Sequence, residues 1–131
     1  TPGTHFSTFG GGPMMCAAAL RVLNWVDTHL VHMRATGERI REALRGMSGI
    51  YDVSGVGMAT AFTPNFFRFG FDAYQFTERC LDNGLLLAVH RRYGPIRLPL
   101  PFNLTDAELN VTLRAIDSSL ESMMARLPGN G

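Results

Sequence analysis

The sequence contains no lysine, and all 12 of its basic residues are arginines. A lysine amine is the side-chain group that forms a Schiff base with a carbonyl compound. Apart from a terminal amine, nothing in this chain can form one. Chemistry that proceeds through a lysine-bound carbonyl compound is therefore beyond this chain alone.

An excess of either charge is also absent, since 12 basic residues face 11 acidic ones and the net charge is +1. Domains that bind nucleic acid concentrate basic residues on one face, so this balance argues against a nucleic-acid partner. No apolar run is long enough to span a bilayer, and no secretory signal leads the chain. The sequence therefore indicates no membrane partner.

Cysteine is scarce, and Cys16 and Cys80 lie far apart with no C-x-x-C motif. This usage predicts two reduced thiols in a cytoplasmic protein, with Cys80 packed as an inert core residue. His29 and His32 have the helical spacing of two metal ligands, but no third ligand lies nearby. Exposed polar histidines are favoured, and no metal site is predicted.

The 131 residues are 46% hydrophobic, which predicts one compact unit with one core. The chain opens at Thr1 within a glycine-rich loop and not at a methionine. We therefore expect a fragment, a processed product or an incompletely observed chain.

Two helical stretches come first, over residues 14–32 and 33–47, with Gly37 marking a bend between or within them. The start of the first stretch, residues 14–20, is apolar all round, so it should be buried on every side. Such burial is unusual for the end of a small lone domain and suggests packing against a larger body.

Short strands are expected next. Residues 51–62 predict two of them, and residues 66–71 suggest another. Residues 85–89 are an apolar run typical of a buried strand. Residues 96–100 predict an edge strand, because Pro99 interrupts the run.

Capping boxes predict two more helices. Asp72 with Gln75 opens one that extends to about Asn83, and Thr105 with Glu108 opens the last. The last helix carries an apolar stripe of Leu109, Leu113, Ile116, Leu120, Met124 and Leu127. The predicted fold is α+β, with a long leading helix followed by a small, mostly antiparallel sheet covered by helices.

The first candidate for binding chemistry is residues 5–13, which read HFSTFGGGP. Glycines let backbone amides approach an anion, and a helix start adds partial positive charge. Ser7 and Thr8 add hydroxyl donors. On these residues alone, an ordinary loop before a helix is favoured over a phosphate cradle.

The second candidate is Arg97, which stands inside an apolar run. A buried arginine without a partner is costly, so Arg97 must reach solvent, form an ion pair or bind an anion. Its guanidinium suits a carboxylate held by two hydrogen bonds. Spacing alone slightly favours the ion pair. Nearby, His90, Arg91 and Arg92 could also help to hold an anionic group, although a solvated strand end is favoured.

Taken in order, these pieces resemble the class III aminotransferases, which include ornithine, acetylornithine and 4-aminobutyrate aminotransferases and glutamate-1-semialdehyde aminomutase. Residues 5–13 resemble the family's H-x-S/T-T-F/Y-G-G-N-P loop, with glycine in place of the asparagine. Residues 96–108, with IRLPLPFNLT and Glu108, resemble I-R-x-x-P-P-L-x-I-T-x-x-E. Further pieces are CAAA at 16–19, VSGVGM at 53–58 and DNGLLL at 82–87.

The resemblance implies site residues for a cofactor, pyridoxal 5'-phosphate (PLP). The family's loop threonine, here Thr8, donates to the cofactor phosphate of the neighbouring subunit in a homodimer, and Ser7 would support it. The family's strand arginine, here Arg97, binds the substrate carboxylate in many members. The catalytic lysine of the family lies upstream of the loop. No catalytic residue is therefore expected in this chain.

The resemblance also implies an organisation of the chain in a fold-type I PLP enzyme. Residues 1–12 would be the end of the large domain, 13–32 the interdomain helix and 33–131 the C-terminal small domain. The expected function is that of the C-terminal portion of a transferase that moves an amino group between an amino acid and a keto acid. This portion alone should be inactive.

Three alternatives stay open at this point. The complete protein could be an aminomutase. The chain could be a non-catalytic binding or dimerisation module derived from the aminotransferase small domain. It could also be one subunit of a split aminotransferase.

Overall fold

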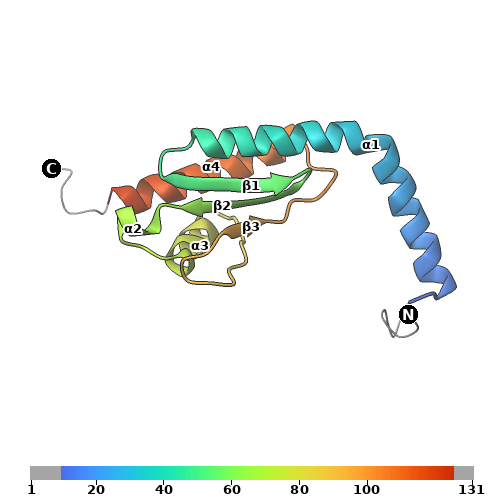
Figure 1. The fold of residues 1–131 in the computed structure, drawn as a ribbon, viewed down its shortest axis with the longest axis horizontal. Helices are drawn as coiled ribbons and strands as arrows, with labels where there is room; N and C mark the ends of the chain where they lie inside the picture. Colours follow the sequence, from blue (N-terminus) through green and yellow to red (C-terminus); the bar gives the residue numbers. More distant parts are fainter. Residues whose placement is uncertain (1–9, 126–131) are drawn as a thin grey trace. The chain divides into compact units, whose positions relative to one another are not determined.

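The structure is a computed structural model in which residues 10–125 are described. The chain divides into two compact units, Thr1–His32 and Met33–Gly131. The elements, shown in Figure 1, are α1 (Pro13–Gly46), β1 (Ile50–Val56), β2 (Ala59–Pro64), α2 (Phe66–Phe69), α3 (Ala73–Asp82), β3 (Ile96–Leu98) and α4 (Asp106–Met124). The predicted α+β class, with a long leading helix and a small antiparallel sheet, is confirmed.

Helix α1 is continuous through the point where two helical stretches were predicted. Gly37 does not end it, and this residue is buried. A side chain at Gly37 would overlap the carbonyl oxygen of Gly57 in the turn between β1 and β2. Glycine is therefore required here for close approach of two backbones rather than for a bend.

The apolar start of α1 differs from the prediction of all-round burial. Met14, Met15 and Leu20 are 78%, 53% and 60% exposed in this chain. An apolar pattern indicates that a segment favours burial, but burial also requires another surface to pack against, and the described residues provide none for the start of α1.

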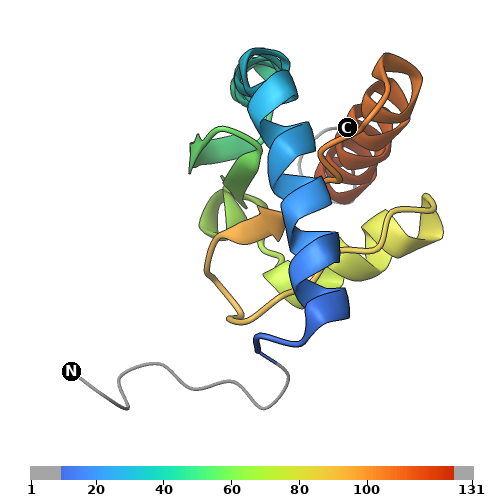
Figure 2. The ribbon, with the colours of Figure 1, turned by 90° about the vertical axis from the view of Figure 1, so that its right-hand side faces the viewer.

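The sheet has the order β1-β2-β3, and both pairs of strands are antiparallel. Phe62 pairs with Ile96, and these two side chains are buried on one face of the sheet. Arg97 pairs with Ala61, and this pair points to the opposite face because alternate residues of a strand face opposite sides. Helices α3 and α4 contact each other and lie on one side of the sheet, as Figure 2 shows. None of the described helices of this unit covers the other face.

The core of the second unit lies between the sheet and the helices. Its larger apolar members, each with no more than 1% exposure, come from α1, β2, α3, β3 and α4: Ile40, Leu44, Phe62, Phe76, Cys80, Ile96, Leu98, Ile116 and Leu120. Burial of each large apolar side chain stabilises the fold by roughly 1.5–3 kcal/mol. The rings of Phe62 and Phe76 meet edge to face with centroids 6.0 Å apart.

Both predicted capping boxes are confirmed. The Asp72 side chain accepts from the Gln75 N–H and the Gln75 side chain accepts from the Asp72 N–H, which begins α3. Thr105 and Glu108 form the same reciprocal pair at the start of α4. These bonds satisfy N–H groups that a helix start leaves without partners.

The strand suggested for residues 66–71 is wrong, because the aromatic run begins with the short helix α2. The Asn65 side chain accepts from the Arg68 N–H, and Gly70 ends the helix at φ 67°. Capping residues on both sides therefore favour a helical turn over the β propensity of the phenylalanines.

The buried strand predicted for residues 85–89 is also wrong. Only an isolated antiparallel bridge forms here, between Ala88 and Arg97. Leu87 is buried at 8% exposure, whereas Leu86 is 79% exposed. An apolar run of this length does not reveal whether one face or both faces will be covered.

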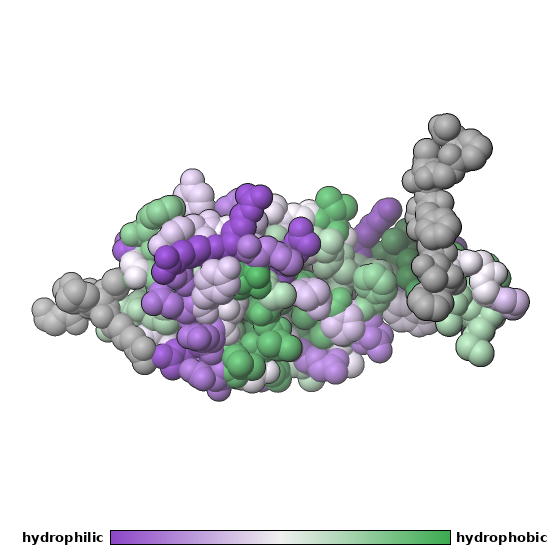
Figure 3. All heavy atoms as spheres, turned by 90° about the horizontal axis from the view of Figure 1, so that it is seen from below, coloured by the Kyte–Doolittle hydropathy of each residue, from purple (hydrophilic) through white to green (hydrophobic). Residues whose placement is uncertain are grey.

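Other large apolar side chains of the second unit also reach the surface, including Phe67 at 84% and Leu81 at 57% exposure. Figure 3 shows hydrophobic surface, in green, beside hydrophilic surface, in purple, on the face seen from below. Within residues 10–125, no helix has both the length and the hydropathy needed to cross a membrane.

Candidate anion-binding site

Arg97 is the central residue of β3 and projects from the open face of the sheet. Its cross-strand partner on β2 is Ala61, which in turn pairs with Ser54 on β1. On its other side, Arg97 bridges to Ala88. Residues paired across strands share a face, so two small side chains, Ala61 and Ala88, flank Arg97. This leaves room beside it for a ligand.

No ion pair or hydrogen bond within residues 10–125 engages the Arg97 side chain. The residue is exposed, while its strand neighbours Ile96 and Leu98 are buried. Exposure removes the cost of a buried charge. The ion pair favoured by spacing therefore has no carboxylate in the described part of the chain, and both edges of the guanidinium are available to an anion.

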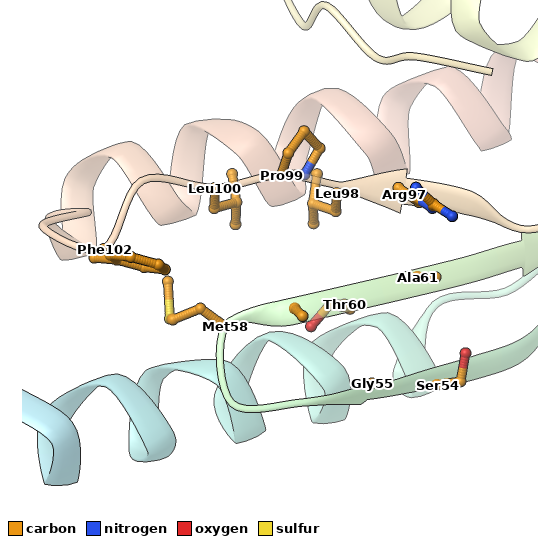
Figure 4. A pocket seen from close by; sticks show the side chains of 11 residues that line it. Ser54, Gly55, Met58, Thr60, Ala61, Arg97, Leu98, Pro99, Leu100 and Phe102 are labelled. Carbon is orange, nitrogen blue, oxygen red and sulfur yellow. The ribbon is translucent and has the colours of Figure 1, made fainter. Parts of the chain in front are cut away.

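A groove of about 490 Å³ runs beside Arg97, between the β1–β2 hairpin and residues 97–102. Figure 4 shows Arg97 at one end of the row of labelled side chains, with Met58 and Phe102 at the other end. Of the described residues that line the groove, Arg97 alone carries a charge. The groove can thus hold a carboxylate at one end and a hydrocarbon chain along its length.

On the other side of Arg97 lies a second pocket, of about 300 Å³. Its lining residues are His90, Arg91, Gly94, Pro95 and Arg97. No acidic residue stands among them, so both pockets next to Arg97 favour a negatively charged ligand.

Arg92 does not join this pocket. Its Nε donates to Asp72 Oδ2 at 2.7 Å, and its guanidinium lies 5.8 Å from the ring centroid of Tyr93. The backbone N–H of Gln75, and then the Arg92 guanidinium, hold the pKa of Asp72 below its ordinary value. Of the three residues 90–92, Arg92 is therefore a structural ion-pair partner.

Sequence reasoning missed Arg41, which holds the turn at the end of the groove. This buried side chain donates to Gly57 O at 2.7 Å and to Glu38 Oε2 at 2.7 Å. Glu38 and Arg41 are three residues apart on α1, and Arg41 is among the residues of this helix that are buried in the core. The signal that could have revealed it is its position at the edge of the apolar stripe that contains Ile40 and Leu44.

Ser7 and Thr8, predicted at the cofactor phosphate, lie outside the described residues. Their role stays a prediction. The neighbouring helix start is described: α1 begins at Pro13, and the first bond of its ladder runs from Cys16 N to Gly12 O at 2.9 Å. The N–H groups of the first turn thus have no partner in the helix itself.

His29 is occupied by contacts within its own helix. Its Nδ1 lies 2.8 Å from Trp25 O, and its ring stacks on the Trp25 ring with centroids 4.1 Å apart. Within residues 10–125, no three His, Cys, Asp or Glu side chains are grouped to hold a metal ion.

Cys16 and Cys80 are both free thiols, and burial raises the pKa of Cys80 to about 11. This agrees with Cys80 as an inert core residue.

Comparison with protein families and curated proteins relates this chain to known enzymes. No family model matches it. The chain is 33% identical to the acetylornithine aminotransferase of Corynebacterium efficiens over 125 residues. This aligned region covers 95% of this chain and 30% of that protein. The chain is 35% identical over 126 residues to the acetylornithine aminotransferase of Archaeoglobus fulgidus, covering 93% of this chain and 29% of that protein. The chain therefore spans about 30% of the length of these relatives.

Solved structures give the same result for the fold. The ornithine aminotransferase of Toxoplasma gondii ME49 superposes with a TM-score of 0.78 at 26% identity, over 97% of this chain and 31% of that one. The acetylornithine aminotransferase of Elizabethkingia anophelis superposes with a TM-score of 0.70 at 26% identity, over 93% of this chain and 33% of that one.

The fold and the sequence are thus similar to part of one class of protein, the aminotransferases. More narrowly, the resemblance to the class III members of the ornithine and acetylornithine type is confirmed, over nearly the whole of this chain.

Proposed function

We propose that this chain is the C-terminal part of a class III PLP-dependent aminotransferase, in which Arg97 binds the carboxylate of the amino acid or keto acid. The observation that carries the proposal is an arginine that has no ion-pair partner within residues 10–125 and lies between Ala61 and Ala88 on an open sheet face. It occurs in a chain similar to acetylornithine aminotransferases over 95% of its length.

The contribution of this chain is to bind and orient. Two parallel hydrogen bonds from the Arg97 guanidinium fix both the position and the direction of a carboxylate. Holding the substrate in one orientation removes much of the entropic cost of reaching the reactive geometry. Arg97 can do this with little rearrangement, since no carboxylate within residues 10–125 competes for it.

The cofactor, when bound, supplies the electron sink for the reaction. The chain has no lysine to attach it. We propose that the chain helps to bind the cofactor through its phosphate, which Thr8 would hold with support from Ser7. A helix start with unpaired N–H groups suits an anion, and α1 begins at Pro13 next to this loop. The lysine must come from outside these residues.

The proposal extends to assembly and location. Residues 1–12 would end the large domain, 13–32 would form the interdomain helix, and 33–131 would be the small domain. The complete enzyme would be a cytoplasmic homodimer, with Thr8 reaching the phosphate of the neighbouring subunit.

The direct test is an amino-transfer assay on the complete protein loaded with PLP. The donor panel should include ornithine and N-acetylornithine, the substrates that the names of the relatives suggest, with several keto acids as acceptors. We expect transfer from at least one donor. A folded, PLP-loaded protein that transfers no amino group from any of them would contradict the proposal.

The role of Thr8 gives a separate prediction. Thr8→Ala in the complete enzyme should weaken PLP binding by about 1.5–3 kcal/mol, because one hydrogen bond to a charged phosphate is lost. The measurement is the PLP dissociation constant of the variant against that of Thr4→Ala, a matched change in the same loop. Equal affinities for the two variants would remove Thr8 from the phosphate site.

A further inference from the structure

We infer that Phe67 on α2 is a positioning residue for ligand binding at Arg97, because its ring holds Tyr93 and with it the loop of residues 90–95. The inference rests on the proposed function, in which Arg97 binds a carboxylate. Phe67 lines neither of the two pockets beside Arg97. It therefore acts through the loop and not by touching the ligand.

The first observation is that the six residues of this loop divide into two groups. Four of them line the pocket of about 300 Å³ beside Arg97: His90, Arg91, Gly94 and Pro95. The other two, Arg92 and Tyr93, are directed to α2 and α3 instead. The position of the pocket wall thus depends on how Arg92 and Tyr93 are held.

The second observation is the polar anchor of the loop, at Arg92. Its side chain donates to Asp72 Oδ2 at 2.7 Å, and its carbonyl oxygen accepts from the N–H of Ala73 at 2.8 Å. Both bonds run to the start of α3. They fix the first half of the loop and leave the second half, which leads into β3, to other contacts.

The third observation is the aromatic anchor, at Tyr93. Its ring stacks on Phe67 with centroids 5.3 Å apart and an interplanar angle of 25°. It also meets the edge of Phe66 at 6.2 Å. The backbone bond of this turn, from the Gly94 N–H to Arg91 O, is long at 3.4 Å and therefore weak. The ring contacts are thus the stronger restraint on the turn.

The fourth observation is the exposure of Phe67. Its neighbour Phe66 is buried at 2% exposure and belongs to the core, whereas Phe67 is 84% exposed. A ring this exposed gains little from burial, so its stack on Tyr93 is the contact that gives it a role. Asn65 and Gly70 cap α2 at its two ends, which fixes the direction in which Phe67 is presented.

Preorganisation links this stack to the affinity at Arg97. When the pocket wall is in place for only part of the time, the apparent affinity of a ligand falls in proportion to that fraction. Tyr93 lies four residues before Arg97, so the stack restrains the segment that carries the guanidinium. The reacting groups are not altered by a change at Phe67, so KM should respond and kcat should not.

The test is the steady-state kinetics of Phe67→Ala in the complete, PLP-loaded enzyme. The KM for the carboxylated substrate should rise about three- to tenfold, as expected for the loss of one aromatic pair, while kcat and the PLP content stay at their wild-type values. Phe67→Tyr retains the ring and should keep the wild-type KM. Tyr51→Ala is the matched control. It removes a ring of 77% exposure from β1, which the central strand β2 separates from β3, and it should not change KM.

Two further measurements tie the effect to the stack. In a Tyr93→Ala background, Phe67→Ala should raise KM no further, because the partner ring is already gone. Hydrogen exchange of the complete protein, followed by mass spectrometry, should be faster at residues 90–95 in Phe67→Ala than in Tyr51→Ala. Effects of Phe67→Ala and Tyr93→Ala that add in full would overturn the inference. So would a Phe67→Ala enzyme whose kcat falls while its KM stays at the wild-type value.

The inference and the proposed function fail separately, because the affinity for the probe pentanoate can be measured without amino transfer. Suppose that the protein transfers no amino group, but Phe67→Ala weakens pentanoate binding about three- to tenfold. The proposed function would then fall and the positioning role would stand. Amino transfer with equal KM values for Phe67→Ala and Tyr51→Ala would overturn the positioning role alone.

Discussion

At the scale of residues, Arg92 and Arg97 lie close together in the sequence but have different surroundings, and these surroundings indicate a structural role for one and a binding role for the other. Arg92 lies 2.7 Å from a carboxylate oxygen of Asp72, which itself caps α3. Arg97 projects from a strand between small residues and has no carboxylate within reach in the described part of the chain. The same side chain is thus an ion-pair partner at one position and a candidate ligand-binding group at the other.

The Asp72–Arg92 pair makes stability depend on pH. The Gln75 N–H and Arg92 hold the pKa of Asp72 below its ordinary value of 3.8 in the fold. A carboxyl group with a lowered folded pKa stabilises the fold above its unfolded pKa, and this contribution is lost as the pH falls through the folded pKa. Asp72→Asn keeps a good helix cap but loses the charge. The variant should therefore have a lower free energy of unfolding than the wild-type chain at neutral pH, and this difference should shrink as the pH falls into the acid range.

Chemical denaturation across the acid range measures that deficit. Asp117→Asn is the control, since its side chain forms no ion pair within residues 10–125. A deficit of Asp72→Asn that stays constant down to the most acidic pH would show that the ion pair and its pKa shift are not the cause.

The two cysteines should differ in reactivity. Alkylation requires the thiolate, and burial both shields Cys80 and raises its pKa to about 11. Cys16 is exposed. Iodoacetamide near neutral pH should therefore modify Cys16 in the native chain and reach Cys80 only after denaturation, as peptide mass spectrometry can show. Equal rates in the native chain would mean that α3 is not packed as described.

Sequence reasoning at this scale found Arg97 because an isolated charge in an apolar run is conspicuous. It left the ion pair and the ligand as alternatives, since partners from distant segments are fixed only by the fold. It missed Arg41 for the same reason: the acceptor on Gly57 comes from a turn that approaches only when α1 packs on the hairpin.

At the scale of elements, helix ends follow local chemistry. The boxes at Asp72 and Thr105 were predicted because donor and acceptor lie three residues apart in the sequence. Residues 66–71 and 85–89 were misassigned because aromatic and apolar runs suit both strands and helical or irregular segments. In those runs, the caps and the neighbouring layers decide the structure.

The contact between α1 and the hairpin gives a prediction at this scale. Gly37→Ala should destabilise the second unit by about 1–3 kcal/mol, because the methyl group overlaps the Gly57 carbonyl and forces the backbones apart. Gly46→Ala is the matched control in the same helix, where a Cβ meets nothing within 4 Å. It should stabilise the helix by about 0.5–1 kcal/mol.

Thermal or chemical unfolding of Gly37→Ala and Gly46→Ala measures their free energies of unfolding and so tests this prediction. If Gly37→Ala were as stable as Gly46→Ala, the close approach of α1 to the β1–β2 turn would be refuted, and with it the account of how the end of the groove is held.

At the scale of the whole molecule, the chain resembles a part of an enzyme and not a complete one. It spans about 30% of the acetylornithine aminotransferases that it matches, and it has no lysine. What it contributes is an open sheet face with Arg97 at its centre, between two pockets. The α+β class was predictable, because capping, periodicity and motif order all agree. The open face was not, since it depends on which side of the sheet the helices cover.

The most direct test of the central claim is the steady-state kinetics of Arg97→Leu in the complete, PLP-loaded enzyme, with Arg114→Leu as the control. If Arg97 binds the substrate carboxylate, the KM for the carboxylated substrate should rise about 10- to 100-fold, which corresponds to the loss of a charge-assisted hydrogen bond. The PLP content should stay at the wild-type level, and Arg114→Leu should keep the wild-type KM. A KM for Arg97→Leu equal to that of the wild type would contradict the account.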